Sequence, residues 1–590
     1  MMRRFLSIIF FLTILLSSPL AACTVTPQTA TPLAATATLT QPTSPPPTAT
    51  PAPGPTPVQP VAVGAVQGLP AGSEGFPWWD DSTFYEIFVR SFFDSNGDGI
   101  GDLQGIIQKL DYLNDGDPST HTDMGITGIW LMPIFPSPSY HGYDVTDYMN
   151  VNPDYGTLDD LKQLLQAAHQ RGIRIILDMP LNHTSTANAW FQQSLDPNSP
   201  YRNWYIWSDS DPGYLGPWGE KVWHPSPSGK GYYYGVFDSS MPDLNYKNPQ
   251  VVAAIQDVMK FWLQDVGVDG FRFDGARYLI EDGKTMADSP DNHNWFTQTR
   301  QFIKGINPQA LLLGEVWTDD FTVSTYMKGD QLDLAFDFDL ASAMMTSVNS
   351  GTADKVDNQL TFSTKTFPAG SSAPFLTNHD MDRVMSQLAG NVDKAKNAAV
   401  MLLTSQGVPF VYYGEEIGMQ GKRGSEKTDI NRRLPMQWTA ADNAGFTSAT
   451  PWAAVYPFHS GTNVDFENSK PDSLLNLYRT LIQLRTEHVA LRVGQTYKVS
   501  RSDKPVYAIL RASQEEQVLV ILNLGTEPLD NIALTLNSGP LTGQYHVVPL
   551  LGAGSFPDLT ANATGGFAAY QPFASLPPNA RLILQLQPVK

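Results

Sequence analysis

The chain of 590 residues alternates apolar, strand-like runs with amphipathic helical segments through most of its length. One unit begins at Thr157, which can form a capping box with Asp160, and ends at Gly172, just before the apolar run 173–177. Strands that alternate with helices in this way form parallel sheets. Eight such runs predict an α/β fold, a (β/α)8 TIM barrel, with strands at residues 84–89, 125–133, 173–177, 270–274, 310–315, 332–338, 374–380 and 408–413.

Three of the predicted strands end in a carboxylate. Asp274 follows a run rich in phenylalanine, Glu315 follows three leucines and a glycine, and Asp380 closes a third run. Active sites of such barrels lie at the C-terminal ends of the strands, so the three acids are expected to meet at one face. Arg272 lies two residues before Asp274, on the same strand face, where its charge favours the ionised carboxylate. Taken alone, this pair could equally be an ordinary ion pair at a strand end.

Two further motifs stand in order with these three segments, DMPLNH at 178–183 and MPDLN at 241–245. Together the five segments resemble the ordered sequence regions of the α-amylase family of glycoside hydrolases. The resemblance extends from about Trp78 to the C-terminus. The MPDLN motif is similar to that of family members intermediate between endo-acting amylases, cyclomaltodextrin-cleaving enzymes and the oligo-1,6-glucosidase group. The resemblance implies a hydrolase of α-glucosidic bonds.

The resemblance also implies a role for each acid. Asp274 would be the nucleophile, Glu315 the general acid/base, and Asp380 the carboxylate that binds sugar hydroxyls and stabilises the transition state. Glycoside hydrolysis of this kind needs two carboxyl groups with different pKa values. The apolar neighbours of Glu315 agree with this division, because they are expected to raise its pKa.

The leading hypothesis is an α-amylase that cleaves α-1,4 bonds in starch, maltodextrins or related α-glucans with retention of configuration. An α-glucosidase, a cyclomaltodextrinase or neopullulanase, or a trehalose-synthase-like transglycosylase is the alternative. Arg277 and Tyr278 stand where many α-amylases have Lys-His, which leaves the preferred chain length open. A non-catalytic, amylase-like binding protein is the remote alternative, since such relatives usually lack part of the carboxylate set that is complete here.

Further residues are expected to bind the sugar at the cleaved bond. The resemblance implies that histidines near strand ends donate to hydroxyls and that a tyrosine serves as a stacking platform, although a lone histidine in a barrel is more often structural. Asp144 resembles the acid that small-oligosaccharide α-glucosidases place against the non-reducing end, and Arg383 would orient the third carboxylate. The expected substrate-binding set is His141, Tyr143, Asp144, His183, Arg272, His379 and Arg383.

The loop after the first predicted strand, DSNGDGIGD at 94–102, has oxygen-bearing side chains at alternate positions with glycines between them. Hard oxygen ligands in such a spacing bind calcium. Gly105 stands where an EF-hand has its Glu, so this is not an EF-hand. The alternative interpretation is a polar turn that binds no metal ion. A similar loop occurs at this place in the resembling enzymes. We expect a structural Ca²⁺ ion on Asp94, Asn96, Asp98, the Ile100 carbonyl and Asp102.

The remaining segments divide the chain into domains. About sixty residues between the third strand and the next helix are too many for an ordinary βα loop and predict an inserted domain B. Short apolar strands past residue 494 predict a C-terminal antiparallel β-sandwich. The expected organisation is a barrel at 76–183 and 247–493, domain B at 184–246 and the sandwich at 494–590. A formal net charge of −20 excludes a nucleic-acid partner, and we expect a monomer.

The N-terminus has the features of a bacterial lipoprotein. A basic start and an apolar segment too short to span a membrane precede Leu20-Ala21-Ala22-Cys23, which resembles a lipobox. Cys23 is the only cysteine and would be lipidated after removal of the signal peptide, residues 1–22. A plain secretory signal is the alternative. Residues 23–75, rich in Thr, Pro and Ala, are expected to form an extended tether that holds the enzyme outside the cytoplasmic membrane.

Overall fold

The structure is a computed structural model and describes residues 68–424 and 428–589. The predicted signal peptide, Cys23 and most of the predicted tether lie outside the described residues. Within the described part of the chain, no helix is both long and apolar enough to span a lipid bilayer.

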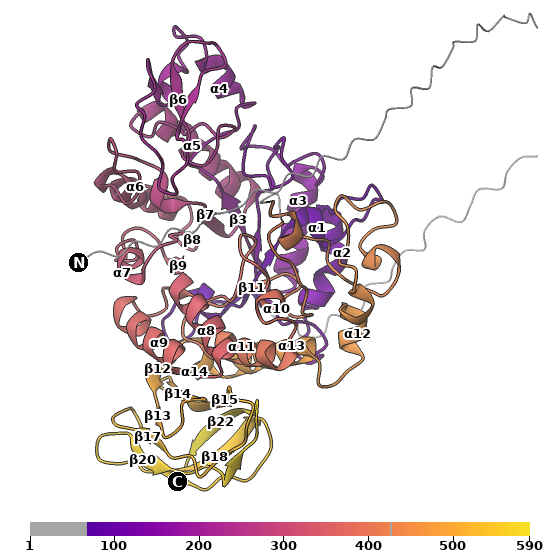
Figure 1. Ribbon diagram of the computed structural model, residues 1–590, viewed down its shortest axis with the longest axis vertical. Helices are drawn as coiled ribbons and strands as arrows, with labels where there is room; N and C mark the ends of the chain where they lie inside the picture. The colour runs from indigo at the N-terminus through magenta and orange to yellow at the C-terminus, as the bar shows by residue number, and fades with distance from the viewer. Residues whose placement is uncertain (1–67, 425–427, 590) are drawn as a thin grey trace, which may run out of the picture. The chain divides into compact units, whose positions relative to one another are not determined.

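Eight parallel strands form a single sheet that closes into a barrel, as the alternation of helices and strands predicts (Figure 1). A parallel bridge between Phe375 and Phe410 joins the two ends of the sheet. In sheet order, the strands are β10 (Ser372–Ala373), β9 (Leu334–Phe336), β8 (Leu311–Gly314), β7 (Gly270–Phe273), β3 (Arg174–Met179), β2 (Gly128–Leu131), β1 (Phe84–Ile87) and β11 (Phe410–Tyr412).

Helices surround the barrel, and their ends lie where the sequence places them. Thr157 forms the expected capping box with Asp160, and Asn248 caps the helix that begins at Pro249. That helix continues as a π-helical turn, η3 (Phe261–Val266), which ends at Gly267 in a left-handed conformation with φ 92°. The longer helices are α2 (Leu103–Leu113), α3 (Leu158–Gln170), α5 (Pro249–Lys260), α6 (Pro290–Ile306), α8 (Phe338–Ser350), α9 (Asp354–Thr366), α11 (Val392–Thr404) and α13 (Leu474–Glu487).

The seventh strand is shorter than predicted and is displaced. The expected strand 374–380 pairs only through Phe375, whereas the regular pairing of β10 lies two residues earlier. Pro374 accepts a hydrogen bond from the amide of Phe410, but it has no N–H of its own to donate to the ladder. The chain from Phe375 to Asp380 is therefore irregular, and it leaves the barrel wall at the point where the third carboxylate lies.

Two smaller β-structures accompany the barrel. Between β3 and α5, a three-stranded antiparallel sheet contains β4 (Trp207–Ser208), β6 (Tyr232–Tyr234) and β5 (Trp223–Pro225), preceded by α4 (Ala189–Ser194). The C-terminal region contains an antiparallel sheet of six strands and one of three, which share one hydrophobic core. The strands of the larger sheet are β12 (Gln495–Lys498), β14 (Val506–Ala512), β15 (Gln517–Asn523), β22 (Arg581–Pro588), β18 (Gln544–Leu551) and β19 (Leu559–Thr560), and those of the smaller are β13 (Ser500–Arg501), β17 (Leu534–Leu536) and β20 (Phe567–Tyr570).

Candidate active site

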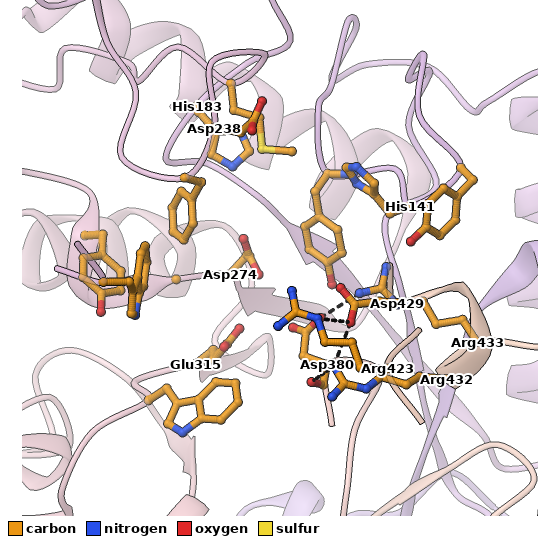
Figure 2. A pocket seen from close by; sticks show the side chains of 18 residues that line it. His141, His183, Asp238, Asp274, Glu315, Asp380, Arg423, Asp429, Arg432 and Arg433 are labelled. Atoms are coloured by element: carbon orange, nitrogen blue, oxygen red, sulfur yellow. Dashed lines mark hydrogen bonds and ion pairs between the residues drawn. The ribbon is translucent and has the colours of Figure 1, made fainter. Parts of the chain in front are cut away.

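The three predicted carboxylates meet at one cavity of about 780 Å³ at the C-terminal ends of the barrel strands. Asp274 follows β7, Glu315 follows β8, and Asp380 follows the irregular segment after Pro374. Figure 2 shows the three side chains directed into the same space. The cavity is lined by Tyr140, His141, Tyr143, His183, Trp218, Phe237, Asp238, Met241, Asp274, Gly275, Tyr278, Glu315, Trp317, Asp380, Arg423, Asp429, Arg432 and Arg433.

The guanidinium of Arg272 lies beneath the first two carboxylates. Nη1 is 2.7 Å from Oδ1 of Asp274 and 2.7 Å from Oδ1 of Asp178, while Nη2 contacts Oε2 of Glu315. Arg272 is fully buried, and its guanidinium carbon lies 4.9 Å from the centre of the Trp130 ring. One buried cation thus holds Asp274 and Glu315 side by side. Asp178 is the third carboxylate that contacts the Arg272 guanidinium. The sequence predicted the contact with Asp274, but not the contact with Glu315.

Glu315 has the protonation state of a general acid. Burial raises its pKa to about 8, although the charge of Arg272 acts in the opposite direction. At neutral pH the Glu315 carboxyl group therefore retains its proton. Asp274 lies beside it with one oxygen on Arg272 and a side chain 14% exposed toward the cavity. The pair provides a proton donor next to a carboxylate, which is the combination that glycoside hydrolysis requires.

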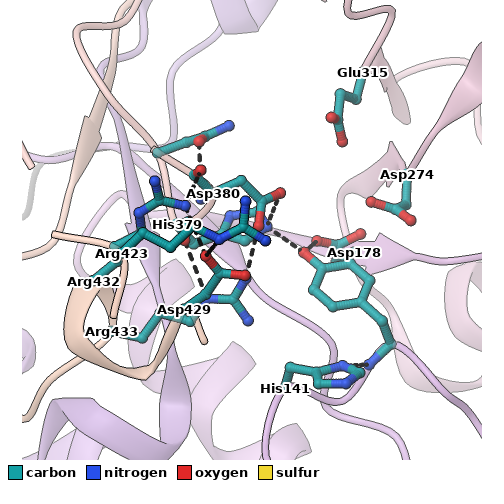
Figure 3. A network of polar contacts seen from close by, with 12 residues as sticks. His141, Asp178, Asp274, Glu315, His379, Asp380, Arg423, Asp429, Arg432 and Arg433 are labelled. Atoms are coloured by element: carbon teal, nitrogen blue, oxygen red, sulfur yellow. Dashed lines mark hydrogen bonds and ion pairs between the residues drawn. The ribbon is translucent and has the colours of Figure 1, made fainter. Parts of the chain in front are cut away.

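Asp380 is held by two cationic side chains, as Figure 3 shows. Oδ1 lies 2.7 Å from Nη2 of Arg433, and Oδ2 lies 3.2 Å from Nε2 of His379. Burial alone would raise the pKa of Asp380, but His379 and Arg433 outweigh it and hold the pKa well below its ordinary range. Asp380 is therefore an ionised acceptor at the cavity wall.

Neutral polar groups complete the wall. Burial lowers the pKa of His183 to about 4 and also lowers that of His141, so both imidazoles are uncharged at neutral pH. The hydroxyl of Tyr143 donates to Asp178 at 3.0 Å and lies 2.7 Å from Nε2 of His379. These three side chains line the cavity as predicted, and they suit an uncharged, hydroxyl-rich ligand.

A family model described as "Alpha amylase, catalytic domain" matches residues 86–494 of the chain. The chain belongs to the α-amylase family. It is 39% identical over 460 residues to "Alpha-amylase 3" of Dictyoglomus thermophilum, covering 76% of this chain and 85% of the relative. It is 34% identical over 554 residues to a "Trehalose synthase/amylase" of Mycolicibacterium smegmatis, covering 82% and 89%. Among solved structures, the alpha-amylase from H. orenii shares 40% identity with a TM-score of 0.74, covering 86% of this chain and 99% of that one.

Four members of the predicted substrate-binding set of this α-amylase-family enzyme do not line the cavity. Arg272 and His379 are fully buried behind the carboxylates, and both ring nitrogens of His379 contact protein groups. Asp144 is buried and accepts hydrogen bonds from Ser137 and Ser139. Both serines bond the same oxygen, Oδ1, of Asp144.

The fourth is Arg383, and the prediction that it orients the third carboxylate is wrong. Arg383 is buried and donates to the backbone carbonyls of Arg432 and Tyr413, at 2.8 Å and 2.6 Å. Arg433 makes the expected contact instead. Its Nε also donates to the backbone carbonyl of His379 at 3.1 Å, so it fixes both the backbone and the carboxylate of the segment that ends in Asp380.

The sequence analysis also missed the aromatic walls of the cavity. Trp218 and Phe237 come from the inserted segment, and Tyr278 packs against both of them. Trp317, two residues after Glu315, is 47% exposed and stacks on Phe338 with ring centres 4.5 Å apart. The wealth of aromatic residues in the insertion was a signal for such a wall, but composition does not show which rings face the cavity.

The predicted calcium loop has the chemistry of a hard-cation site but also strong internal hydrogen bonding. Asp94 accepts from the amides of Asn96, Gly97 and Gly99, and Asp102 accepts from Ser95 and caps α2. In the described residues, no group of three or more His, Cys, Asp and Glu side chains is placed to hold a metal ion. Asp94, Asp98 and Asp102, three of the five expected ligands, do not form such a group, and the calcium site stays a prediction.

Proposed function

We propose that this enzyme is a retaining α-amylase that hydrolyses α-1,4-glucosidic bonds in starch, maltodextrins or related α-glucans. The observation that carries the proposal is the pair on Arg272: an ionisable Asp274 beside a Glu315 whose pKa burial raises to about 8. Aromatic rings and uncharged histidines also line the cavity, and together with this pair they suit a sugar polymer.

The reaction proceeds in two displacements. A carboxylate oxygen of Asp274 attacks the anomeric carbon while the carboxyl group of Glu315 gives its proton to the leaving glycosidic oxygen. The Glu315 carboxylate then takes a proton from a water molecule, and the resulting nucleophile displaces Asp274 from the same carbon. Two inversions retain the anomeric configuration. Asp380, kept ionised by His379 and Arg433, accepts hydrogen bonds from sugar hydroxyls and favours the positive charge of the transition state.

The position of Asp144 supports action on long chains. In the family resemblance this acid would close the non-reducing end of the site in enzymes for small oligosaccharides. Here Ser137 lies 2.6 Å from the Asp144 carboxylate and Ser139 also contacts it, and the acid is absent from the cavity lining. The cavity lining thus offers no carboxylate from this position to bind the end of a short oligosaccharide.

A second candidate is transglycosylation or the hydrolysis of short α-glucosides. Two relatives that match this chain over most of their own length are named trehalose synthase/amylase and oligo-1,6-glucosidase. The oligo-1,6-glucosidase, from Parageobacillus thermoglucosidasius, is 32% identical, covering 76% of this chain and 90% of the relative. Arg277, beside the nucleophile segment, pairs with Asp288 and donates to the backbone carbonyl of Trp317. It therefore shapes the leaving-group side differently from the Lys-His of many α-amylases.

The product profile distinguishes these activities. The full-length enzyme is incubated with amylose, maltotriose, maltose, a cyclodextrin and pullulan, and products are followed by chromatography and by NMR of the anomeric proton. We expect rapid shortening of amylose to mixed oligosaccharides with the α-anomer released first. Release of glucose alone, conversion of maltose into trehalose, or a β-anomer as first product would each contradict the proposed α-amylase.

We further propose that the enzyme acts outside the cytoplasmic membrane, anchored by lipid on Cys23, and that the loop 94–102 binds a structural Ca²⁺ ion. The first part is supported by the lipobox-like sequence and the uncharged Thr/Pro/Ala segment that follows it. The second is supported by the oxygen-bearing side chains of Asp94, Asn96, Asp98 and Asp102 at the spacing of a calcium loop.

A further inference from the structure

Glu86 is a carboxylate inside the barrel wall. It is the third residue of β1, in a strand whose other members are Phe, Tyr and Ile, and it is 2% exposed. Residues two apart in a strand point to the same side, so Glu86 points as Phe84 does, toward the interior where Phe84 stacks on Phe410. A buried carboxylate is costly unless it is paired and hydrogen-bonded, so the partner of Glu86 indicates its role.

The partner of Glu86 is His379. Oε1 of Glu86 lies 2.5 Å from Nδ1 of the imidazole, although 293 residues separate the two in sequence. The other ring nitrogen, Nε2, lies 2.7 Å from the hydroxyl of Tyr143 and 3.2 Å from Oδ2 of Asp380. The ring is fully buried and meets Trp130 edge to face, with centres 5.6 Å apart. His379 therefore bridges the barrel wall and the carboxylate at the cavity.

An imidazole between two carboxylates donates a hydrogen bond to each of them. Ionised carboxylates only accept hydrogen bonds, so both ring nitrogens must carry hydrogen. Burial acts to lower the pKa of His379, but Asp380 and Glu86 outweigh it and raise the pKa to about 10. The imidazole is thus a cation at neutral pH, and its charge lies against Asp380.

We propose that Glu86 is a positioning residue for the hydrolysis: it holds His379 as a cation in one orientation, and His379 in turn holds Asp380 ionised and correctly placed at the cavity wall. The role assigned to Asp380 rests on the proposed function. Glu86 itself does not line the cavity and takes no part in a bond-breaking step. Its effect passes through His379.

Other charges face His379 from the neighbouring elements. Asp178 on β3 and Glu315 after β8 interact with the imidazole, and Tyr143 contacts Nε2 from the loop after β2. Two cations are also near: Arg272 on β7 contacts the hydroxyl of Tyr143, and Arg433 contacts the backbone carbonyl of His379 and the carboxylate of Asp380. Replacement of Glu86 by a neutral residue leaves Asp380 as the one carboxylate adjacent to the ring nitrogens. The two arginines remain. The imidazole then releases its proton at a lower pH.

The substitution Glu86→Gln tests this, since it removes the charge and keeps the size of the side chain. In the full-length enzyme, Glu315 sets the alkaline limb of kcat/KM on a soluble maltodextrin near pH 8. Without the Glu86 charge, the pKa of His379 is expected to fall from about 10 to below that of Glu315, which moves the limb to lower pH by about one unit. Activity at about pH 8 is expected to fall roughly five- to tenfold, and at about pH 5.5 less than twofold, because the imidazole still binds its proton there.

Two companion variants separate this effect from a general loss of packing. Glu86→Asp keeps the charge and is expected to restore the alkaline limb in part, even where kcat is lower. Glu416→Gln is the matched control, because Glu416 is also buried. Its carboxylate accepts hydrogen bonds from Tyr85 and Tyr112, at 2.7 Å and 2.6 Å, and neither bond involves His379. Its pH profile is expected to match that of the unsubstituted enzyme.

An unchanged profile for Glu86→Gln, or a loss of activity by the same factor at every pH, would overturn the proposal. An unsubstituted enzyme without activity on any α-glucan would instead refute the proposed function. If Glu86→Gln does not fold, the unsubstituted enzyme is labelled with ¹⁵N-histidine, and the signals of His379 are assigned by their loss in His379→Gln. Protonation of both ring nitrogens at about pH 7.5 is expected, and a neutral imidazole there would overturn the proposal.

Discussion

At the scale of single residues, one buried guanidinium organises the chemistry. Arg272 contacts Asp274, Glu315 and Asp178 at once, so the two carboxyl groups that face the cavity share a cation. The shared cation does not make them equivalent. For Glu315, burial outweighs the attraction of Arg272 and the proton is retained, whereas Asp274 places one oxygen on the same guanidinium. The raised pKa of Glu315 thus comes from its burial, against the effect of the shared cation.

Removal of either carboxyl group is expected to abolish hydrolysis. Asp274→Asn and Glu315→Gln are expected to lower kcat by about 10³-fold or more, because each group performs a step that the other cannot perform. Circular dichroism and thermal melting are expected to show an intact fold. Glu515→Gln, on the exposed surface of the C-terminal region, is the matched control and is expected to be fully active. Near-normal turnover by either active-site variant would refute the assigned mechanism.

The expected pH profile follows from the pKa values of Glu315 and Asp380. Glu315 acts as an acid only while it is protonated, and its pKa is raised to about 8, so activity is expected below that value and lost as pH rises through it. Asp380 remains ionised far into the acidic range, since His379 and Arg433 hold its pKa low, so it does not limit activity at mildly acidic pH. A measurement of kcat/KM between about pH 4 and pH 10 checks this. An alkaline limb near the ordinary pKa of a glutamate would contradict it.

At the scale of elements, the position of the three acids at strand ends was predictable from the sequence. The contacts that hold these acids in place were not. Asp274, Glu315 and Asp380 follow apolar runs, and the rule that barrel strands present their C-terminal ends at one face brings them together. Arg433 follows Asp380 by 53 residues and comes after the last strand of the barrel, so no sequence spacing links the two residues. Glu86 was visible as a charge within an apolar strand, but only the closed barrel shows that it meets His379. Pro374 explains the strand that was predicted too long.

The loop 94–102 is the element whose ligand is still to be tested. An ion that binds only the folded state stabilises it by about 2.7 kcal/mol when its free concentration is a hundredfold above Kd. We therefore expect the melting temperature to fall by several degrees when excess EDTA replaces millimolar calcium. Asp98→Ala is expected to abolish that difference. Asp117→Ala changes a partly exposed aspartate in another turn, with the same hydrogen bond to the amide two residues on, and is expected to preserve it. Equal melting temperatures for the unsubstituted enzyme with and without calcium would refute the site.

At the scale of the whole molecule, the sequence predicts a catalytic barrel, an inserted segment and a C-terminal β-structure, and the described residues show a barrel with both additions. The inserted segment contributes Trp218 and Phe237 to one wall of the cavity, and the barrel contributes the acids and Trp317. We therefore expect substrate length to depend on aromatic surfaces supplied by more than one region of the chain. Exposed rings of this kind have no period in the sequence, which explains why the chemistry was predictable while the chain-length preference was not.

The last prediction concerns where the whole molecule acts. If Cys23 is the lipid-modified N-terminus of the mature protein, the catalytic barrel is held outside the cytoplasmic membrane by an uncharged tether rich in Thr, Pro and Ala. Buried acyl chains contribute ~0.8 kcal/mol per methylene, so two or more chains on one cysteine anchor the protein stably where a single chain does so only reversibly. A Pro-rich tether extends by up to ~3.1 Å per residue, which lifts the active site clear of the lipid surface toward a polymeric substrate. Cys23→Ser is expected to release the protein from the membrane fraction with its specific activity unchanged, because no step of the hydrolysis uses a thiol. Membrane fractionation of cells that express the two forms checks this, and equal partition of both forms into the soluble fraction would leave only an ordinary secretory signal.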